Sequence, residues 1–353
     1  MAYPKLSDKD LKEAWRLYTQ YKSVIKAAAA AGLNRSTMQH RIDTYRSKFA
    51  KEQMLDEMPD EEKPEFTVMA LPDDDLEIDE LVELRIKQFS KKREYQEATK
   101  LIDVRVRLDG PVGILHFGDP HVDDDGTDLE TLRIHSDLTK IEGVWGANVG
   151  DTTNNWVGRL ARLYANQSTT SAQAWKLAEW FISRTRWLYM VGGNHDAWAG
   201  SADPIKWIAR QSDTLYQSSE CRVRLKFPSG RSVIVNARHD FSGHSQWNPA
   251  HGQMKAAQMG HRDHLMISGH KHCSGYGVIK DPISGRICHA VQVASYKFYD
   301  SYARERGFRD QTLSPACFTV IDPALEEDHP DMIKLFWDPI EGVEYLKWKR
   351  QKA

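Results

Sequence analysis

Acidic, amide and imidazole side chains follow directly on five apolar stretches of the sequence. The stretches end in the runs GDPH (118–121), GDTTNN (150–155), GNHD (193–196), ARHD (237–240) and GHKH (269–272). Each stretch reads as a buried strand, and open α/β sheets place their sites at the carboxyl ends of the strands. Isolated carboxylates and imidazoles are costly to bury, so a cluster of them is best explained by bound cations.

The candidate ligands share one chemistry, because they offer oxygen or imidazole nitrogen and no thiolate. They are Asp119, His121, Asp151, Asn194, His239, His270 and His272. Such groups suit Mn²⁺, Fe²⁺ or Zn²⁺; we place Mn²⁺ first and keep Mg²⁺ as a further alternative. The set is too large for one ion, so we expect two divalent ions that share one carboxylate.

The ordered set GDxH, GDxxN, GNHD, a lone strand-end histidine and GHxH resembles the calcineurin-like metallophosphoesterase superfamily over about residues 110–325. The resemblance implies an α/β (α+β) fold, a two-sheet αββα sandwich with a binuclear metal centre. It also implies three sets of ligands: Asp119, His121 and His272 on one metal, Asn194, His239 and His270 on the other, and Asp151 bridging both.

The same resemblance gives roles to the residues beside the metals. His195 would face the substrate and protonate or stabilise the leaving oxygen, and Asp196 would orient His195. A hydroxide shared by the two ions would attack phosphorus in line with the leaving oxygen. The resemblance therefore predicts hydrolysis of a phosphoester.

The type of phosphoester depends on the residues around these motifs. Asn154-Asn155-Trp156 stands where phosphatases of the superfamily often have Asp-Arg, and Asn154 stands where its double-strand-break repair nucleases often have a histidine. An amide there can bind a phosphate oxygen without supplying charge, which favours a diester. His244 is a second candidate substrate contact. The loops 154–168, 239–255 and 295–309 interleave aromatic and basic residues, as surfaces that bind single strands do, although packed lids or solvated faces are the alternative.

The first 50 residues carry ten Lys and Arg against four Asp and Glu, and their pattern is helical. A helix capped by Ser7, an alanine-rich helix that ends at Gly32 and a helix capped by Asn34 form a helix-turn-helix pattern. The residues that its last helix would present to DNA are Arg35, Ser36, Thr37, Gln39, His40 and Arg41. A helical hairpin used for oligomerisation is the alternative.

The sequence between this module and the motifs is strongly acidic. Residues 51–80 carry two Lys against thirteen Asp and Glu and read as an extended linker, either a plain spacer or a mask for the basic module. A charged helix over 80–100 follows. We therefore expect a small all-α helix-turn-helix-like DNA-binding domain at 1–50, an acidic linker and charged helix at 51–100, and a metallophosphoesterase domain at 101–353, with strands and outer helices.

Composition adds a few exclusions. The net charge is −2, and no apolar run reaches the roughly 20 residues of a membrane span. The first residues lack the apolar core of a signal peptide. Cys221, Cys273, Cys288 and Cys317 show no CxxC spacing and read as free thiols. We expect a cytoplasmic protein of a bacterium or of a phage-infected cell, with no membrane partner.

These patterns together predict a metal-dependent phosphodiesterase, and specifically a DNA nuclease whose partner is DNA. A homo-oligomer is left open. One alternative is a phosphatase or cyclic-nucleotide phosphodiesterase whose N-terminal helices serve assembly. Another is a DNA-binding scaffold with a vestigial phosphoesterase domain, which the complete ligand set argues against.

Overall fold

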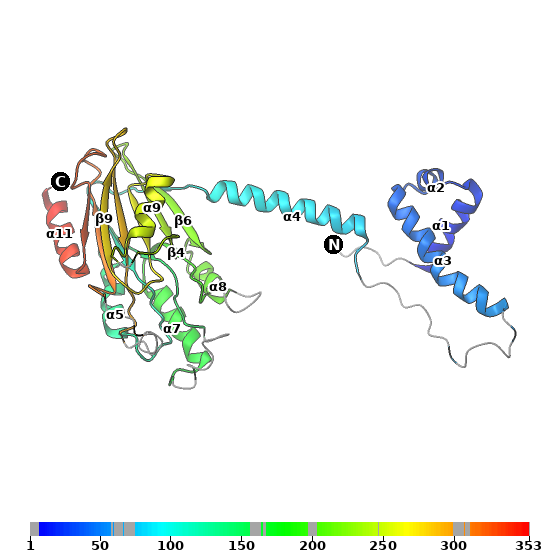
Figure 1. Cartoon of the computed structure of the whole chain (residues 1–353), viewed down its shortest axis with the longest axis horizontal. Helices are drawn as coiled ribbons and strands as arrows, with labels where there is room; N and C mark the ends of the chain where they lie inside the picture. Colours follow the sequence, from blue (N-terminus) through cyan, green and yellow to red (C-terminus); the bar gives the residue numbers. More distant parts are fainter. Residues whose placement is uncertain are drawn as a thin grey trace. The chain divides into compact units, whose positions relative to one another are not determined.

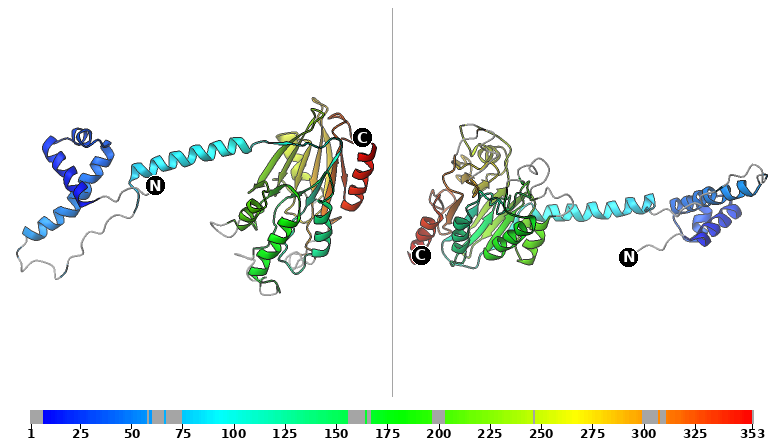
Figure 2. Two further views of the ribbon diagram at one scale, coloured as in Figure 1. Left: turned by 180° about the vertical axis from the view of Figure 1, so that it is seen from behind. Right: turned by 90° about the horizontal axis from the view of Figure 1, so that it is seen from below.

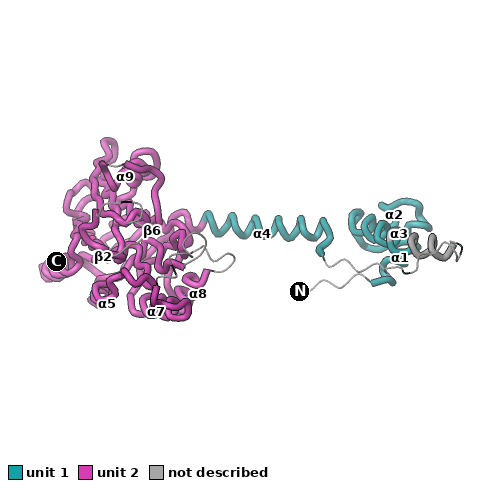
Figure 3. The backbone as a smooth tube through the Cα atoms, turned by 60° about the horizontal axis from the view of Figure 1, so that its bottom comes forward, with its two compact units in different colours: residues 1–97 teal, residues 98–353 magenta. Residues whose placement is uncertain are grey.

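The chain divides into two compact units, residues 1–97 and 98–353 (Figure 3). The computed structural model describes residues 7–57, 59, 66, 75–155, 164, 167–196, 203–245, 247–298, 307 and 311–352. The central part of the acidic linker therefore lies outside the described residues.

The first unit is built from helices whose ends are fixed by capping residues. Its helices are α1 (Asp8–Tyr21), α2 (Val24–Ala31), α3 (Arg35–Glu57) and α4 (Ile78–Thr99). Ser7 and Asp10 form a reciprocal capping box at the start of α1. Gly32 ends α2 with a left-handed φ of 67°, and the Asn34 side chain accepts from the Thr37 amide at 2.7 Å. The helix ends predicted at Ser7, Gly32 and Asn34 are confirmed.

A small apolar core holds α1, α2 and α3 together. Its buried members are Ala14, Leu17, Ala27, Ala28, Met38 and Ile42. The fourth helix, α4, has no buried residue, and Ile78, Val82, Ile86 and Phe89 form an exposed apolar stripe along it. Most helices in proteins are stabilised by packing of one face, and no residue of this 22-residue helix is buried.

The second unit is a sandwich of two mixed six-stranded sheets (Figures 1 and 2). The first sheet has the order β1–β6–β7–β8–β10–β9 and consists of β1 (Ile102–Arg105), β6 (Glu220–Lys226), β7 (Ser232–Arg238), β8 (Leu265–Ser268), β10 (Ile287–Gln292) and β9 (Gly275–Lys280). The second sheet has the order β12–β11–β2–β3–β4–β5 and consists of β12 (Ile333–Phe336), β11 (Ala316–Ile321), β2 (Val112–Phe117), β3 (Val144–Asn148), β4 (Trp187–Val191) and β5 (Tyr216–Gln217).

Strand direction brings the polar runs to one edge of each sheet. In the second sheet β2, β3 and β4 are parallel neighbours, and in the first sheet β7 and β8 are parallel neighbours. The strands β6 and β7 form a hairpin, with antiparallel pairing from Glu220 opposite Arg238 to Lys226 opposite Ser232. All five polar runs therefore follow the carboxyl ends of parallel neighbours.

Helices cover both outer faces of the sandwich. The flanking helices are α5 (Leu129–Leu138), α7 (Ser171–Arg184), α8 (Pro204–Gln211) and α11 (Pro339–Lys352) on the second sheet, and α9 (His251–Met259) on the first. In Figure 1, α11 lies at the left edge of this unit and α9 is drawn over the strands. The predicted αββα sandwich, preceded by a small all-α domain, is confirmed.

The main core lies between the sheets. It joins the fully buried Ile114 and Tyr189 of the second sheet to Val223, Val235 and Ile267 of the first. Burial of such side chains contributes about 1.5–3 kcal/mol each, so the sandwich is a rigid platform for the loops at its edge.

Two predictions drawn from composition can be compared with the structure. The four cysteines are free, three of them buried and Cys273 partly buried. In the part of the chain that the structure describes, no helix has both the length and the apolar character needed to cross a membrane.

Candidate metal centre

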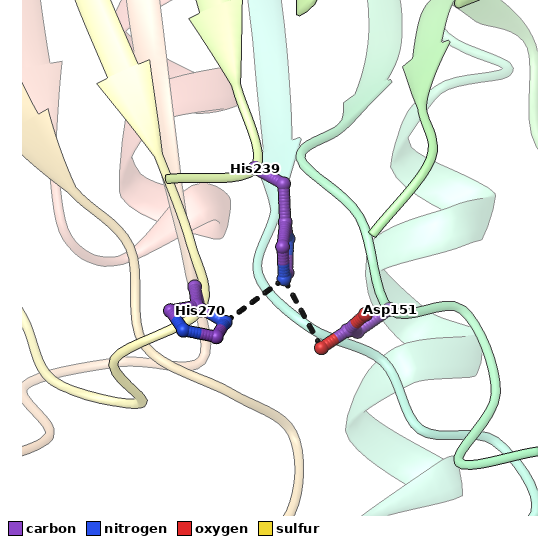
Figure 4. A group of neighbouring side chains, drawn as sticks. All are labelled: Asp151, His239 and His270. Atoms are coloured by element: carbon purple, nitrogen blue, oxygen red, sulfur yellow. Dashed lines mark hydrogen bonds and ion pairs between the residues drawn. The ribbon is translucent and has the colours of Figure 1, made fainter. Parts of the chain in front are cut away.

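The turns after five strands converge on Asp151, which follows β3. His239 follows β7 and His270 follows β8, and with Asp151 they offer ligand atoms that all lie within 4.8 Å of one another (Figure 4). Nε2 of His239 lies 3.2 Å from Asp151 Oδ2 and 3.1 Å from Nδ1 of His270. It also lies 2.8 Å from Oδ1 of Asn194, which follows β4. Residues from three separate strand ends thus meet Asp151 at one point.

The hydrogen bond on the far side of the His239 ring decides what this point can hold. Nδ1 of His239 lies 3.0 Å from the Val149 carbonyl oxygen, so Nδ1 carries a proton and donates it. The Nε2 lone pair of neutral His239 then faces lone pairs of Asp151, Asn194 and His270. A single proton can bond only some of these acceptors, whereas a cation can be shared by all of them. The donor set therefore fits a divalent ion, with imidazole, amide and carboxylate ligands.

A second group lies on the other side of Asp151. Nε2 of His121 lies 3.2 Å from Nε2 of His272, and that atom lies 3.4 Å from Oδ2 of Asp119. Nε2 of His121 is 4.0 Å from Asp151 Oδ2. Asp119 is fully buried, and its Oδ1 accepts no hydrogen bond. An unsatisfied buried carboxylate oxygen beside facing imidazoles again fits a cation.

The pKa values of these groups without a bound ion also indicate that the cluster needs positive charge. Burial, with the nearby Asp151, raises the pKa of Asp119 well above its usual range. Burial opposes ionisation of Asp151 as well, but the adjacent His239 lowers the pKa of Asp151 below its usual value. Burial likewise opposes charge on His239, yet Asp151 raises the pKa of His239 to about 10. A proton on His239 thus supplies the positive charge that the carboxylates require.

The backbone at this edge is strained where the ligands lie. Seven non-glycine residues among those described have positive φ, and four of them are His121 (41°), Asp151 (48°), His270 (70°) and His272 (49°). Asn155 at 43° is a fifth member of the same loops. Left-handed conformations cost on the order of 1–3 kcal/mol each and gather at functional sites. The strain aims the side chains inward.

Two glycines of the sequence motifs allow the loops to approach closely. A Cβ on Gly193 would lie 2.0 Å from Asp151 Oδ1, and a Cβ on Gly269 would lie 2.3 Å from Asp119 Oδ1. Only glycine fits at such positions. The glycines of GNHD and GHKH are therefore explained by the packing of neighbouring turns against the carboxylates.

His195 lies at the rim of the cluster. Its Nε2 is 3.7 Å from Asp151 Oδ2, and its amide donates to Asp151 Oδ1 at 2.9 Å. Its Nδ1 faces the Asn154 carbonyl oxygen at 2.9 Å, which orients the ring. The Asp196 carboxylate, expected to orient His195, accepts from the amides of Gly193 (2.9 Å) and of Thr152 (3.4 Å). It ties the loops after β3 and β4 together.

The two candidate substrate contacts lie in different surroundings. Asn154 is 1% exposed, and its side-chain amide donates to Asp124 Oδ2 at 3.0 Å. The expected contact with a phosphate oxygen thus competes with a hydrogen bond already made. His244 is exposed in the loop between β7 and α9. Residues 156–163, 165–166, 246, 299–306 and 308–309 of the aromatic and basic loops lie outside the described residues.

The candidate DNA-binding residues occupy the first two turns of α3. Arg35 and Ser36 are exposed, and Thr37 uses its amide in the Asn34 cap. The other three have acidic neighbours: Gln39 bonds to Asp43, His40 pairs with Glu77, and Arg41 lies 4.0 Å from Asp10. Half of the predicted set therefore already contacts carboxylates.

The sequence analysis did not identify a buried group of charged residues, Asp123, Asp124 and Lys297, that is linked to His195 through Asn154. Asp123 accepts from the Asn154 amide at 2.6 Å, and Asp124 pairs with Lys297 at 2.9 Å. Asp123 and Asp124 lie within the run HVDDDG, directly after a predicted ligand. Three successive acidic residues beside a metal motif were the available signal, although nothing in the sequence pairs them with Lys297.

Comparison with other proteins adds little beyond this geometry. No family model matches the sequence, and no curated protein matches it. The solved structure of the calcineurin-like phosphoesterase YfkN from Bacillus subtilis matches at 12% sequence identity with a TM-score of 0.32, over 69% of this chain and 97% of that chain. We base the function on the arrangement of the side chains.

Proposed function

We propose that the chain is a metal-dependent phosphodiesterase that acts on DNA as a nuclease. The observation that carries the proposal is the convergence of Asp151, Asn194, His239 and His270 on one point, with His121, His272 and Asp119 beside it. Seven such ligands suit two divalent ions bridged by Asp151, with Mn²⁺ first among the candidates. Two such ions would activate water and neutralise charge on a phosphate group.

The residues of the chain supply the remaining functions. Asp119, His121 and His272 would hold one ion, and Asn194, His239 and His270 the other. His195, 17% exposed at the rim, would donate a proton from Nε2 to the leaving oxygen while Nδ1 stays bonded to the Asn154 carbonyl. A positioned acid of this kind contributes about 10²–10⁴-fold to the rate.

DNA as the substrate is supported by the separate basic module. Residues 1–50 carry an excess of positive charge, while residues 51–80 carry an excess of negative charge. A basic helical module fits a phosphate backbone. The pairing of His40 with Glu77, which lies in the acidic segment, supports the idea that this segment competes with DNA for the basic surface.

The test is a nuclease assay with linear duplex and single-stranded DNA, over Mn²⁺, Zn²⁺, Fe²⁺ and Mg²⁺. Wild-type protein should cleave DNA with at least one metal, and His195→Ala should lose about 10²-fold or more while keeping its metal. A strong preference for a small aryl monoester over an aryl diester and DNA would favour a phosphatase. DNA binding without any hydrolysis would favour a scaffold.

A further inference from the structure

The position of the His195 ring depends on the carbonyl oxygen of Asn154, and other residues hold Asn154 in place. Nδ1 of His195 bonds to the Asn154 oxygen at 2.9 Å. Asn155 also donates from its side chain to the His195 carbonyl at 3.1 Å. Because a peptide group is held through its neighbours, whatever fixes Asn154 also fixes the reach of His195.

Two carboxylates hold Asn154 in place. Its backbone amide donates to Asp123 Oδ1 at 2.6 Å, and its side-chain amide donates to Asp124 Oδ2 at 3.0 Å. Asp123 is 1% exposed and Asp124 is 5% exposed. Hydrogen bonds to buried carboxylates are short and strong, so this loop is restrained at both its backbone and its side chain.

A buried lysine completes the network. Lys297 Nζ lies 2.9 Å from Asp124 Oδ2, and the two side chains are only 8% and 3% exposed. Buried ion pairs give weak net stability because both charges lose their water. Lys297 belongs to a segment after β10 that also contacts the turn after β2, since Ser295 Oγ donates to the carbonyl of Asp119 in that turn at 2.7 Å.

We propose that the Lys297–Asp124 ion pair is a positioning device that, through Asn154, holds the His195 ring where it can donate a proton to the leaving oxygen. This inference rests on the proposed phosphodiesterase function. Lys297 and Asp124 touch neither the substrate nor a metal in this scheme. Their contribution is to keep Nε2 of His195 within reach of the leaving group, because a shift of about 1 Å can cost about 10²-fold in rate.

The neighbouring Asp125 offers a matched control. It follows Asp124 directly, but its carboxylate accepts from the Ser168 amide at 2.6 Å and from the Thr169 hydroxyl at 3.2 Å. These contacts join the same loop to the segment before α7 without reaching Asn154. Asp125→Asn therefore changes a carboxylate in the same loop while leaving the support of His195 intact.

The first test compares two diesters that differ in their leaving group. A p-nitrophenyl diester releases a stable phenolate that needs no proton, whereas a dinucleotide releases an alkoxide that does. Asp124→Asn and Lys297→Met should lower turnover of the dinucleotide on the order of 10–100-fold. Both variants should keep turnover of the nitrophenyl diester within about 3-fold of wild type, and Asp125→Asn should preserve both activities.

A loss that is equal for the two diesters would overturn the proposal, since it would show that the ion pair only supports the fold or the metals. Unchanged turnover of both diesters would also overturn it. Lys297→Arg keeps the charge and should recover part of the dinucleotide activity, which loss of folding would not allow.

A second readout needs no activity. Histidine-selective ¹⁵N labelling of the metal-free full chain, with His195→Gln to identify the signal, reports the His195 Nδ1–H bond to Asn154. Asp124→Asn and Lys297→Met should shift or broaden that signal, and Asp125→Asn should leave it in place. If the wild-type protein hydrolyses neither diester, the proposed function fails, but this spectrum still tests the positioning. A His195 signal identical in all variants would sink the inference.

Discussion

Replacing Gly193 with alanine tests the packing of the metal centre separately from the stability of the rest of the fold. The new methyl would lie 2.0 Å from Asp151 Oδ1 and 2.3 Å from the Asp151 backbone nitrogen. Carbon and oxygen in contact stand roughly 3.3 Å apart, so the Asp151 carboxylate must move by about 1 Å. Metal–ligand distances tolerate only about 0.2 Å. We therefore expect Gly193→Ala to weaken metal binding by about 100-fold or more. Mutation of residues that hydrogen-bond to metal ligands typically weakens metal binding by about 10–100-fold.

The assay is thermal unfolding with and without metal. A metal at 100 times its Kd stabilises the wild-type protein by about 2.7 kcal/mol, which raises the Tm by roughly 5–10 °C. A 100-fold weaker site gains only about 0.4 kcal/mol at the same concentration. The metal-induced rise is the quantity to compare, because the added methyl itself can cost about 1–3 kcal/mol.

Gly277→Ala is the control for this experiment. Its methyl would lie 2.7 Å from the Met254 sulfur, a flexible side chain on the outer face of the first sheet. This variant should keep the full metal-induced rise. If Gly193→Ala keeps that rise too, at the same metal concentration, the close packing of the GNHD turn on Asp151 does not shape the site.

Three further predictions concern other parts of the chain. Burial lowers the pKa of His135 to about 4, while the unfolded chain protonates this residue near 6.5; the free energy of unfolding should therefore fall as the pH drops from 6.5 to 4, by about 3 kcal/mol for this ring. Urea unfolding of metal-free protein at pH 7 and pH 5 measures this fall in the free energy of unfolding. The variant His135→Gln should show a smaller fall, and an equal fall in both proteins would refute the prediction. Arg35→Ala should weaken DNA binding and lower the salt dependence of log Kd by about one unit; a titration over salt with wild-type affinity and slope would remove Arg35 from the interface. The helix α4 is acidic in its first half and basic in its second, so its apolar stripe should pair antiparallel with the stripe of a second copy. Sedimentation equilibrium should show a dimer, and the double variant Val82→Glu with Phe89→Glu should dissociate it. The control variant Ile283→Glu, at a residue that is 91% exposed, should leave the dimer intact.

The position of the site was predictable because it depends on strand order along the chain. Five polar runs after apolar stretches require only that neighbouring strands run parallel, and β2, β3 and β4 do. The ends of α1 and α2 and the start of α3 were predictable for a similar reason, since Ser7, Gly32 and Asn34 act on the adjacent backbone. Local chemistry and simple topology were sufficient for both.

The support of the site was not predictable, because it depends on contacts between distant segments. Lys297 meets Asp124 across the chain, and the ring of His195 rests on a backbone carbonyl, which any residue could provide. The left-handed φ of His121 also follows from closure of its turn. The helix α11 was not predicted from the sequence, although its buried residues Pro339, Gly342, Val343 and Leu346 recur at helical spacing; Gly342 packs closely against Phe318.

The most direct measurement is the number of metal ions bound per chain. Mass spectrometry of inorganic elements on protein loaded with Mn²⁺ and desalted should find about two ions per wild-type chain. Asp151→Asn, which removes the shared carboxylate and keeps its shape, should retain less than one. Wild-type protein without bound metal after loading with any of the four candidate ions, or Asp151→Asn with the full complement, would contradict the account.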